Sequence, residues 1–358
     1  MTRRSTKRPA AAVGLAIVLV AAVFSAGCSS VAYYARSVGG HLAIVGSARP
    51  VADWVADPQT PPALRDRLLL SQRIRDFAVT ELGEPDNASY RRYADLKRPA
   101  AVWNVVAAPE LSLTLQTWCF VVVGCVGYRG YYDLPMAEAF AAEQRNGGLE
   151  TSVYAVPAYS TLGALPFDWL ADPLLNTFID YPEGELARLI FHELAHQIAY
   201  AAGDTGFNES FATAVERIGG ERWLAQAGAE TRAEFERLDA RRRDFRALTA
   251  KYRSALDALY RSEASDDDKR SRKAALFEAL RAEHATLKLE RWGGFSGYDA
   301  WFARANNASL GVLAAYNDQV PDFLRLFERS GGDFGRFYAE VRRLAALKPG
   351  ERRAALER

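Results

Sequence analysis

The sequence predicts an α+β protein that is mostly helical, and three features of the chain carry this prediction. Strand-like runs are confined to about residues 100–163, and the pattern from Glu183 onward is almost entirely helical. Residues 230–290 form a charged, alanine-rich stretch with apolar residues at heptad spacing, which is typical of a helical hairpin. With 358 residues, 49% of them hydrophobic, the chain is long enough to bury a sizeable core.

The first 27 residues predict an export signal. An uncharged run from Pro9 to Gly27 ends in small residues before Cys28, and four cations precede it: Arg3, Arg4, Lys7 and Arg8. A positive segment, an apolar segment and small residues at the cleavage point define a signal peptide, here residues 1–27. The sequence SAGC resembles the lipobox of bacterial lipoproteins, with Ser25 where leucine is preferred, and this resemblance implies that Cys28 is lipidated. The alternative is an uncleaved membrane anchor, for which the apolar run is barely long enough.

The residues after the signal bear on location and partners. Serines, and no aspartate, follow Cys28, which in lipoproteins of two-membrane bacteria resembles sorting to the outer membrane, facing the periplasm. We therefore expect a membrane contact through an N-terminal lipid anchor. Without the four N-terminal cations the formal net charge falls from +1 to −3, so no basic field suggests nucleic acid as a partner.

Two further cysteines, Cys119 and Cys125, lie six residues apart. In an oxidising exported compartment, a pair that closes so short a loop predicts a disulfide. The alternative is two buried free thiols that pack as small hydrophobic residues.

Helices are expected before the strands. One covers VAYYARSVGGHLAIVGS, residues 31–47, and another starts near Pro61, with Thr60 as its N-cap and Gly83 and Pro85 as its stop. The predicted elements that follow are strands at residues 100–108 and 111–123, a short helix at 134–148 and a strand at 151–163.

A long helical hairpin is expected as an insertion between residues 230 and 290. Four apolar residues recur there every seven positions, which predicts a helix with one apolar seam: Leu238, Phe245, Tyr252 and Leu259. Ser265 and the aspartates after it predict the start of the second helix. The run Arg241–Arg243 favours a solvated face over a binding patch. Further helices are expected over about residues 298–358.

The stretch HELAH, residues 192–196, carries the strongest functional signal. Residues four apart share one face of a helix, so His192 and His196 can bind one ion, with Glu193 about 100° round the helix. This spacing predicts a catalytic site in which two neutral imidazoles hold one Zn²⁺ and the glutamate takes a proton from the attacking water. The helix is expected to begin near Pro182 and to stop at Gly203. The alternative is two histidines with no metal role on a helix surface.

A catalytic zinc needs a third protein ligand. The metzincin pattern fails, because Ala199 stands where it needs glycine and Ala202 where it needs histidine. Asp204 favours turn or cap chemistry. We predict Glu209 as the third ligand, on a second helix that opens with Asn208 as its N-cap and folds back over the first. The alternative is a first-turn glutamate that complements the helix dipole.

These motifs resemble two groups of peptidases. HExxH followed on the next helix by NExxA resembles the gluzincin metallopeptidases, a group that includes thermolysin. The segments HELAHQ, FNESFAT, VPAYSTLG, WCF…GCVGYRGYYD and NNASL…AYNDQVPDF together resemble the bacterial predicted-aminopeptidase family of lipoproteins, over nearly the whole mature chain. The resemblance implies a gluzincin-like core with a small mixed or antiparallel sheet, and it supports a metallopeptidase more strongly than an aminopeptidase.

The gluzincin resemblance also implies where substrate binds. The strand before the active-site helix, here Ser152–Gly163, would lie along the cleft and pair with the substrate backbone; the alternative is an ordinary sheet strand. One departure is Thr213, where the thermolysin pattern has an aspartate that orients a zinc histidine. Asn208 or Glu216 could replace that partner.

Other site residues are expected from the needs of peptide hydrolysis. Tyr316 is the candidate that stabilises the oxyanion, and Tyr159, Arg129 and Tyr131 are candidates for substrate binding. The alternative for each tyrosine is a packing role. His284, in the hairpin, is expected to be a surface or packing residue.

The function expected from the sequence is therefore that of a lipid-anchored zinc peptidase, with a peptide or protein substrate and an aminopeptidase activity on the envelope side. Two alternatives stay open. One is an envelope endopeptidase or processing protease. The other is a non-catalytic lipoprotein with a structural metal site, although structural zinc is normally closed by four ligands rich in cysteine.

Overall fold

The computed structural model describes residues 33–120, 124–158, 161, 168–314 and 319–357. The predicted signal peptide and three of the candidate residues, Cys28, Tyr159 and Tyr316, lie outside these ranges. Within them the chain is mostly helical with small sheets, as the α+β prediction requires. No helix in the described ranges is both long enough and apolar enough to cross a bilayer.

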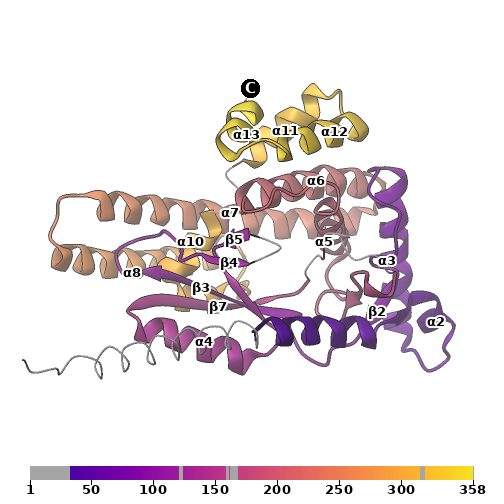
Figure 1. Ribbon diagram of the computed structural model, residues 1–358, viewed down its shortest axis with the longest axis horizontal. Helices are drawn as coiled ribbons and strands as arrows, with labels where there is room; N and C mark the ends of the chain where they lie inside the picture. Colours follow the sequence, from indigo (N-terminus) through magenta and orange to yellow (C-terminus); the bar gives the residue numbers. More distant parts are fainter. Residues whose placement is uncertain (1–32, 121–123, 159–160, 162–167, 315–318, 358) are drawn as a thin grey trace, which may run out of the picture.

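The strands of the described residues form three small sheets (Figure 1). The largest is antiparallel, with β3 between β6 and β7, and its register runs from Val102 opposite Val156 to Pro109 opposite Leu149. A second sheet has the order β1-β2-β8, and a two-stranded ribbon pairs β4 with β5. The strand bounds are β1 Arg49–Pro50, β2 Arg92–Ala94, β3 Val102–Pro109, β4 Trp118–Phe120, β5 Gly124–Val126, β6 Arg129–Tyr131, β7 Leu149–Val156 and β8 Leu174–Leu175.

Helices cover both faces of the main sheet. Helix α4 (Leu134–Asn146) packs on the face that carries Trp103 and Val105, and α10 (Asn307–Ala314) packs on the face that carries Val106. A strand covered on both sides reads as a continuous apolar run, which is why β3 is buried at six successive positions.

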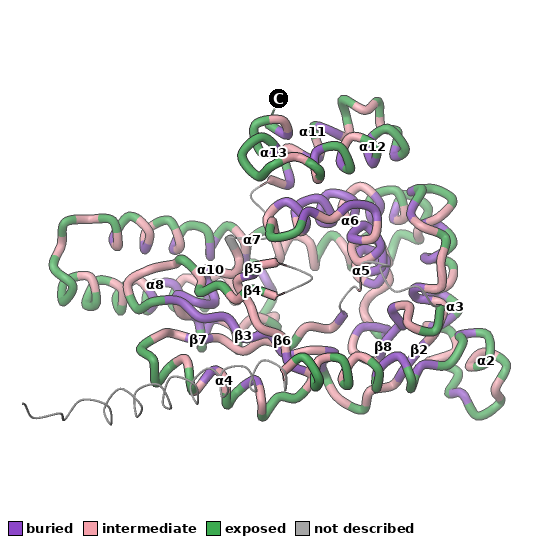
Figure 2. Tube along the Cα trace, in the orientation of Figure 1, coloured by how far each residue is buried: buried purple, intermediate pink, exposed green. Residues whose placement is uncertain are grey.

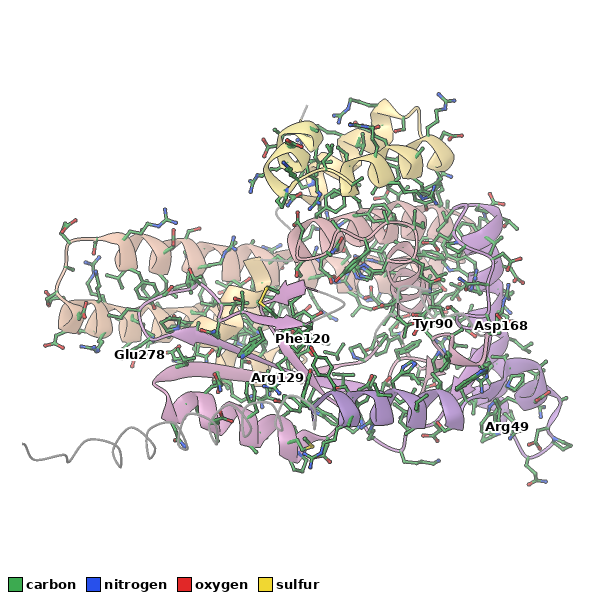
Figure 3. The ribbon with its side chains drawn as sticks, in the orientation of Figure 1. Arg49, Tyr90, Phe120, Arg129, Asp168 and Glu278 are labelled. Atoms are coloured by element: carbon green, nitrogen blue, oxygen red, sulfur yellow. A yellow bond between two sulfur atoms is a disulfide. The ribbon has the colours of Figure 1, made fainter. Side chains whose placement is uncertain are left out.

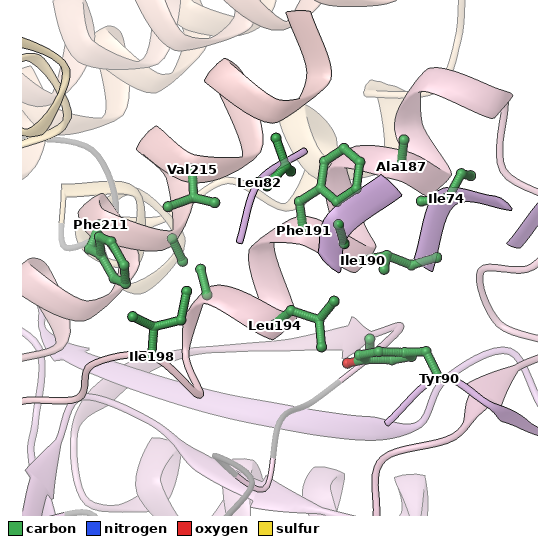
Figure 4. Packing of buried hydrophobic residues seen from close by; sticks show 14 of the residues in the cluster. Ile74, Leu82, Tyr90, Ala187, Ile190, Phe191, Leu194, Ile198, Phe211 and Val215 are labelled. Carbon is green, nitrogen blue, oxygen red and sulfur yellow. The ribbon is translucent and has the colours of Figure 1, made fainter. Parts of the chain in front are cut away.

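The main core surrounds α5 (Glu183–Ala195). Its apolar face packs against α3 (Pro62–Thr80) and α6 (Thr205–Gln226), and Figure 4 shows Phe191, Ile190 and Leu194 among side chains from these helices. The C-terminal helices cover the outer side of α6 (Figure 1): α11 Val320–Arg329, α12 Phe334–Ala345 and α13 Pro349–Leu356. Two short helical pieces complete the body, α2 (Val51–Ala56) and the 3-10 turn η1 (Asp168–Leu170).

The hairpin consists of α7 (Ala229–Arg261) and α8 (Asp266–Glu290), and it projects from the body in Figure 1. The heptad residues Phe245, Tyr252 and Leu259 are buried, and Ser265 caps α8 by accepting a hydrogen bond from Asp268 N at 3.2 Å. Helix α9 (Asp299–Arg304) packs against α8, where His284 stacks on Phe302 at 4.0 Å between ring centroids. His284 is therefore a packing residue.

Three of the local predictions are wrong in detail. Arg241–Arg243 is not simply a solvated face, because the base of the hairpin packs back on α5, where Arg242 pairs with Glu185. Residues 111–117 form no strand; their alternating leucines fill two apolar clusters near α10 instead. Helix α3 has Pro61, and not Thr60, at its capping position.

Glu84, which follows α3, is a buried carboxyl with a consequence for stability. It is 3% exposed, and within the described ranges neither of its oxygens has a hydrogen-bond partner. Burial raises the pKa of Glu84 well above its usual value, although the charge of Arg75 opposes the shift. Glu84 therefore takes up a proton on folding, and the stability this contributes is present below pH about 4.5 and declines as the pH rises above it.

We expect Glu84→Gln to remove this part of the pH dependence, because glutamine keeps the shape of the protonated acid and does not titrate. Relative to the wild type, the variant should become progressively more stable between pH 5 and pH 8 in urea unfolding experiments. Glu81→Gln, at an exposed position three residues earlier, is the matched control. Parallel pH profiles for Glu84→Gln and the wild type would contradict this prediction.

Candidate metal centre

Helix α5 places both histidines of the HExxH stretch on one side. Its apolar residues Leu186, Ile190 and Leu194 face the core, and His192 and His196 lie on another face of the helix. The helix ends at Ala195, and not at Gly203 as predicted, but His196 at the C-cap keeps helical angles of φ −59 and ψ −21. The two rings therefore remain one turn apart, with centroids separated by 4.9 Å.

The chain returns to this face through α6, which begins earlier than predicted. Its N-cap is Asp204, whose carboxylate accepts a hydrogen bond from Phe207 N at 3.0 Å, and not Asn208. Asn208 is buried and instead spans the turn: its side chain accepts from Ala201 N at 2.8 Å and donates to Ala201 O at 2.9 Å. Asn208 therefore holds the turn in the shape that brings Glu209 back over α5.

His192, His196 and Glu209 come together as a group that could hold a metal ion. One ligand atom from each residue lies within 4.8 Å of the other two. Glu209 Oε2 is 3.3 Å from His192 Nε2 and 3.9 Å from His196 Nε2. The three atoms thus converge on one point, which is the arrangement that the ligands of a single ion require.

The electrostatics of the three residues follow from burial and from each other. Burial lowers the pKa of His196 to about 4, so this imidazole is neutral and has a lone pair to offer. Burial would also lower the pKa of His192, but hydrogen bonds to Glu209 and Glu216 raise it well above the usual value. Burial would raise the pKa of Glu209, but His196 and His192 hold it below the usual value. The carboxylate is therefore ionised beside the two rings.

Glu216 fixes the orientation of His192. Thr213 left two candidates for this role, Asn208 and Glu216, and the structure places Glu216 against the histidine. Its Oε2 lies 3.0 Å from His192 Nδ1, and its Oε1 pairs with Arg188. Because Nδ1 donates its proton to Glu216, Nε2, which faces Glu209, is the nitrogen that would release its proton and offer a lone pair to an ion. Burial would raise the pKa of Glu216, but Arg188 and His192 hold it far below the usual value, so Glu216 is a permanent anion.

The hairpin is joined to the same network. Arg188 of α5 also contacts Asp239 of α7, with 3.4 Å between Nη1 and Oδ1. Asp239 in turn accepts from Arg242 at 3.1 Å, and Arg242 pairs with Glu185 of α5. The base of the hairpin therefore contacts the helix that carries the histidines through a chain of four charged residues. These residues were not found from the sequence, because nothing local marks a contact between positions 188 and 239.

The residues present fit a zinc ion. Two imidazole nitrogens and one carboxylate oxygen are the donor set of a catalytic zinc, which leaves one position open. The hydrogen bond from His192 to Glu216 is the support that metal-binding histidines normally receive from a carboxylate. His196 differs, because its Nδ1 is buried and has no partner within the described ranges.

Glu193 lies beside the triad and lines a pocket of about 240 Å³. Burial raises the pKa of Glu193 to about 7, with a further contribution from the carboxylates of Glu209, Asp172 and Glu216. A carboxylate with a pKa near neutrality is suited to take up and return a proton at physiological pH. The pocket is lined by Tyr181, Glu185, Arg188, Leu189, His192, Glu193, Glu216 and Arg242.

Arg129 and Tyr131 do not lie in this pocket. Arg129, labelled in Figure 3, lies over the rings of Tyr33 and Phe140 at 4.1 Å and 4.6 Å from their centroids, and Tyr131 is 7% exposed beside the same rings. Their contacts are those of packing residues between β6, α4 and the helix at residues 33–47. The neighbouring Tyr128 does interact with the triad. Burial raises the pKa of Tyr128, and the negative charge of Glu209 raises it further.

Two other predicted features have a place in the structure. A disulfide joins Cys119 to Cys125 across the β4-β5 ribbon. Within the described ranges, β7 pairs with β3 only, so its other side is an edge of the main sheet. A strand needs an edge of this kind if an extended substrate is to pair with it as an added strand.

We expect Glu216→Gln to weaken zinc binding by about 10–100-fold, the usual effect of losing a carboxylate that supports a metal-binding histidine. Glutamine keeps the shape of the side chain but loses the negative charge facing Nδ1. Chelator competition measures the Kd, and Glu221→Gln, exposed on the same helix, is the matched control. An unchanged Kd in Glu216→Gln would show that the contact at 3.0 Å contributes nothing to metal binding.

Comparison with known proteins agrees with the resemblance to the predicted-aminopeptidase family. No curated protein and no solved structure matches the chain. The family described as "Putative aminopeptidase" matches residues 32–356, which is most of the chain. The protein therefore belongs to this family of aminopeptidase-like proteins.

Proposed function

We propose that the protein is a zinc-dependent peptidase that removes residues from the amino terminus of peptides. One observation carries the metal-dependent part of the proposal: His192, His196 and Glu209 converge on one point, with Glu193 next to His192 on the same helix. The family description supports a peptidase and favours the aminopeptidase over an endopeptidase.

In this proposal His192 Nε2, His196 Nε2 and Glu209 hold the ion. When bound, zinc supplies Lewis-acid polarisation of the scissile carbonyl and acidifies the attacking water. Glu193 takes the proton from that water and returns it to the leaving amine, a role that suits its pKa of about 7. Glu216 keeps the proton of His192 on Nδ1, and Arg188 keeps Glu216 ionised.

The proposal extends to the cell envelope. The support comes from the lipobox-like sequence that ends at Cys28, from the signal-like run before it, and from the disulfide between Cys119 and Cys125, which suits an oxidising compartment. We propose that the protein is anchored by lipid at Cys28 in the outer membrane and faces the periplasm.

A pair of peptides that differ only in an N-terminal acetyl group tests the proposed activity. The full chain is purified with zinc, its metal content is measured, and both peptides are assayed. One zinc per chain and much faster cleavage of the free peptide are the expected results. Equal cleavage of both peptides would indicate the endopeptidase, and bound zinc with neither peptide cleaved would favour the non-catalytic lipoprotein.

A further inference from the structure

Exposed apolar side chains gather around the helix at residues 33–47. Among the residues that the structure describes, seven large hydrophobic side chains are exposed, and three of them lie on this helix: Tyr34, Val38 and Leu42. Their spacing of four residues places them within an arc of about 80° on the helix surface. Isolated exposed hydrophobic residues are normal on a protein surface, but a row of this kind is not.

The opposite side of this helix is fixed to the body of the protein. Ile44 is 2% exposed, Tyr33 donates a hydrogen bond to Gly130 O at 3.0 Å, and a Cβ on Gly40 would lie 2.3 Å from the ring of Tyr132. These three positions lie about 140° round the helix from the exposed row. The row is therefore held away from this fixed side as far as Leu42, whereas Val45, further along the helix in the same arc, is buried; Figure 2 shows the helix exposed along the outside of the molecule.

Two more of the seven side chains border the helix. Leu134 begins α4, to which the helix is joined by a contact of 3.6 Å between Arg36 Nη1 and Met136 Sδ. Trp169 is linked to the other end through Arg92, which donates to Trp169 O at 2.7 Å and to Val45 O at 3.1 Å. Five of the seven exposed apolar side chains thus lie on or beside one helix. The three on the helix itself share one side, and we call these three the apolar face: Tyr34, Val38 and Leu42.

We infer that this apolar face lies on the surface of a lipid bilayer. The described part of the helix begins five residues after Cys28, and the run Pro9–Gly27 before it is uncharged and apolar. Six residues of extended chain span at most about 20 Å, so a lipid on Cys28 would keep Tyr34 within that distance of the membrane. The inference rests on the proposed lipid anchor.

The composition of the helix suits this occupant. Residues 33–47 contain no carboxylate and one permanent cation, Arg36, so nothing on the helix repels an anionic lipid surface. The described part of the helix is not long and apolar enough to cross a bilayer. An apolar row on one side and contacts with the body on the other are the arrangement of a segment that lies in the membrane interface. Contact along this face would give the anchored protein a fixed orientation to the membrane.

Fluorescent labelling of the full chain in vesicles tests the inference. Val38→Cys carries a polarity-sensitive nitrobenzoxadiazole dye, and Leu289→Cys, which is 75% exposed on α8, is the matched control. On vesicles of phosphatidylethanolamine and phosphatidylglycerol, emission at position 38 is expected to rise at least two-fold over the detergent-free protein and to be quenched by doxyl lipids. Position 289 is expected to change little.

Each other outcome overturns the inference in a distinct way. If the chain stays on the vesicles but position 38 behaves like position 289, the anchor is right and the apolar face is not a membrane contact. If the chain does not associate with vesicles at all, the proposed anchor fails as well. A rise at position 38 without vesicles, together with a doubled mass, would assign the face to a second copy of the chain. Peptidase activity is measured separately and depends on none of these results.

Discussion

Glu193→Gln is expected to lower kcat for peptide hydrolysis by about 10²–10⁴-fold, the usual contribution of a general acid–base group. Glutamine has nearly the shape of glutamate but cannot take a proton from water. The metal content should stay that of the wild type, because the atoms that converge belong to His192, His196 and Glu209 and not to Glu193. Loss of kcat with the metal retained would separate a chemical role from a role in metal binding.

Glu221→Gln serves as the control for this measurement. Glu221 lies on α6 and is exposed, so it tests the effect of replacing a carboxylate outside the pocket. The measurements are kcat with an unblocked peptide and zinc per chain for the two variants and the wild type. If Glu193→Gln keeps the activity of the wild type, Glu193 is not the base, and the function proposed above needs another proton acceptor.

The sequence was most informative where the signal is local. The spacing of His192 and His196 needs only the geometry of one helix turn, and the heptads of α7 need only an apolar seam. Glu209 required one further step, across a turn, and the structure brings it to the two rings. In each case the residues that meet are close in sequence, so few arrangements of the backbone were possible.

Boundaries were harder because tertiary contacts decide among similar local options. Both Asp204 and Asn208 can cap a helix. Asp204 is the N-cap of α6, because the side chain of Asn208 already makes two hydrogen bonds to the backbone of Ala201. Gly203 has φ of +77, as a glycine near a helix end often has, but the helix stops eight residues before it. Local propensity predicted the helix correctly but placed its C-terminal end at the wrong residue.

The outer contacts of the site could not be predicted from the sequence. Arg188 meets Glu216, 28 residues away, and Asp239, 51 residues away. Glu216 was one of two candidates, but the arginine and the second carboxylate have no spacing that marks them. Arg129 and Tyr131 were candidates because peptide hydrolysis needs such side chains, but in the structure both pack around Tyr33.

These contacts connect the hairpin to the candidate metal centre. Asp239 comes from α7, and it shares Arg188 with Glu216, which in turn holds His192. An insertion that only bound a partner would not need to touch the helix of the histidines. The arrangement instead makes the orientation of His192 depend on how the base of α7 packs against α5.

Removing Arg188 is therefore expected to have the largest effect on stability. The side chain of Arg188 is 6% exposed and that of Glu216 is 15% exposed. Arg188→Met keeps the apolar stem but takes from buried Glu216 the guanidinium that it pairs with, and removing one partner of a buried pair costs about 3–5 kcal/mol of unfolding free energy. Urea unfolding in EDTA measures this cost without any contribution from bound metal.

The double variant Arg188→Met with Glu216→Gln distinguishes two causes of this loss of stability: an unpaired buried charge on Glu216, and the loss of packing by Arg188. If the cost arises from the uncompensated carboxylate, neutralising it should recover about 1–3 kcal/mol, the coupling energy seen for residues of one buried network. Asp239→Asn tests the third residue of this network. It should lower the unfolding free energy less in the Arg188→Met background than in the wild type. Additive costs throughout would mean that Arg188 stabilises the α5-α6 contact by packing alone, and His192 would then be oriented by Glu216 without help from the hairpin.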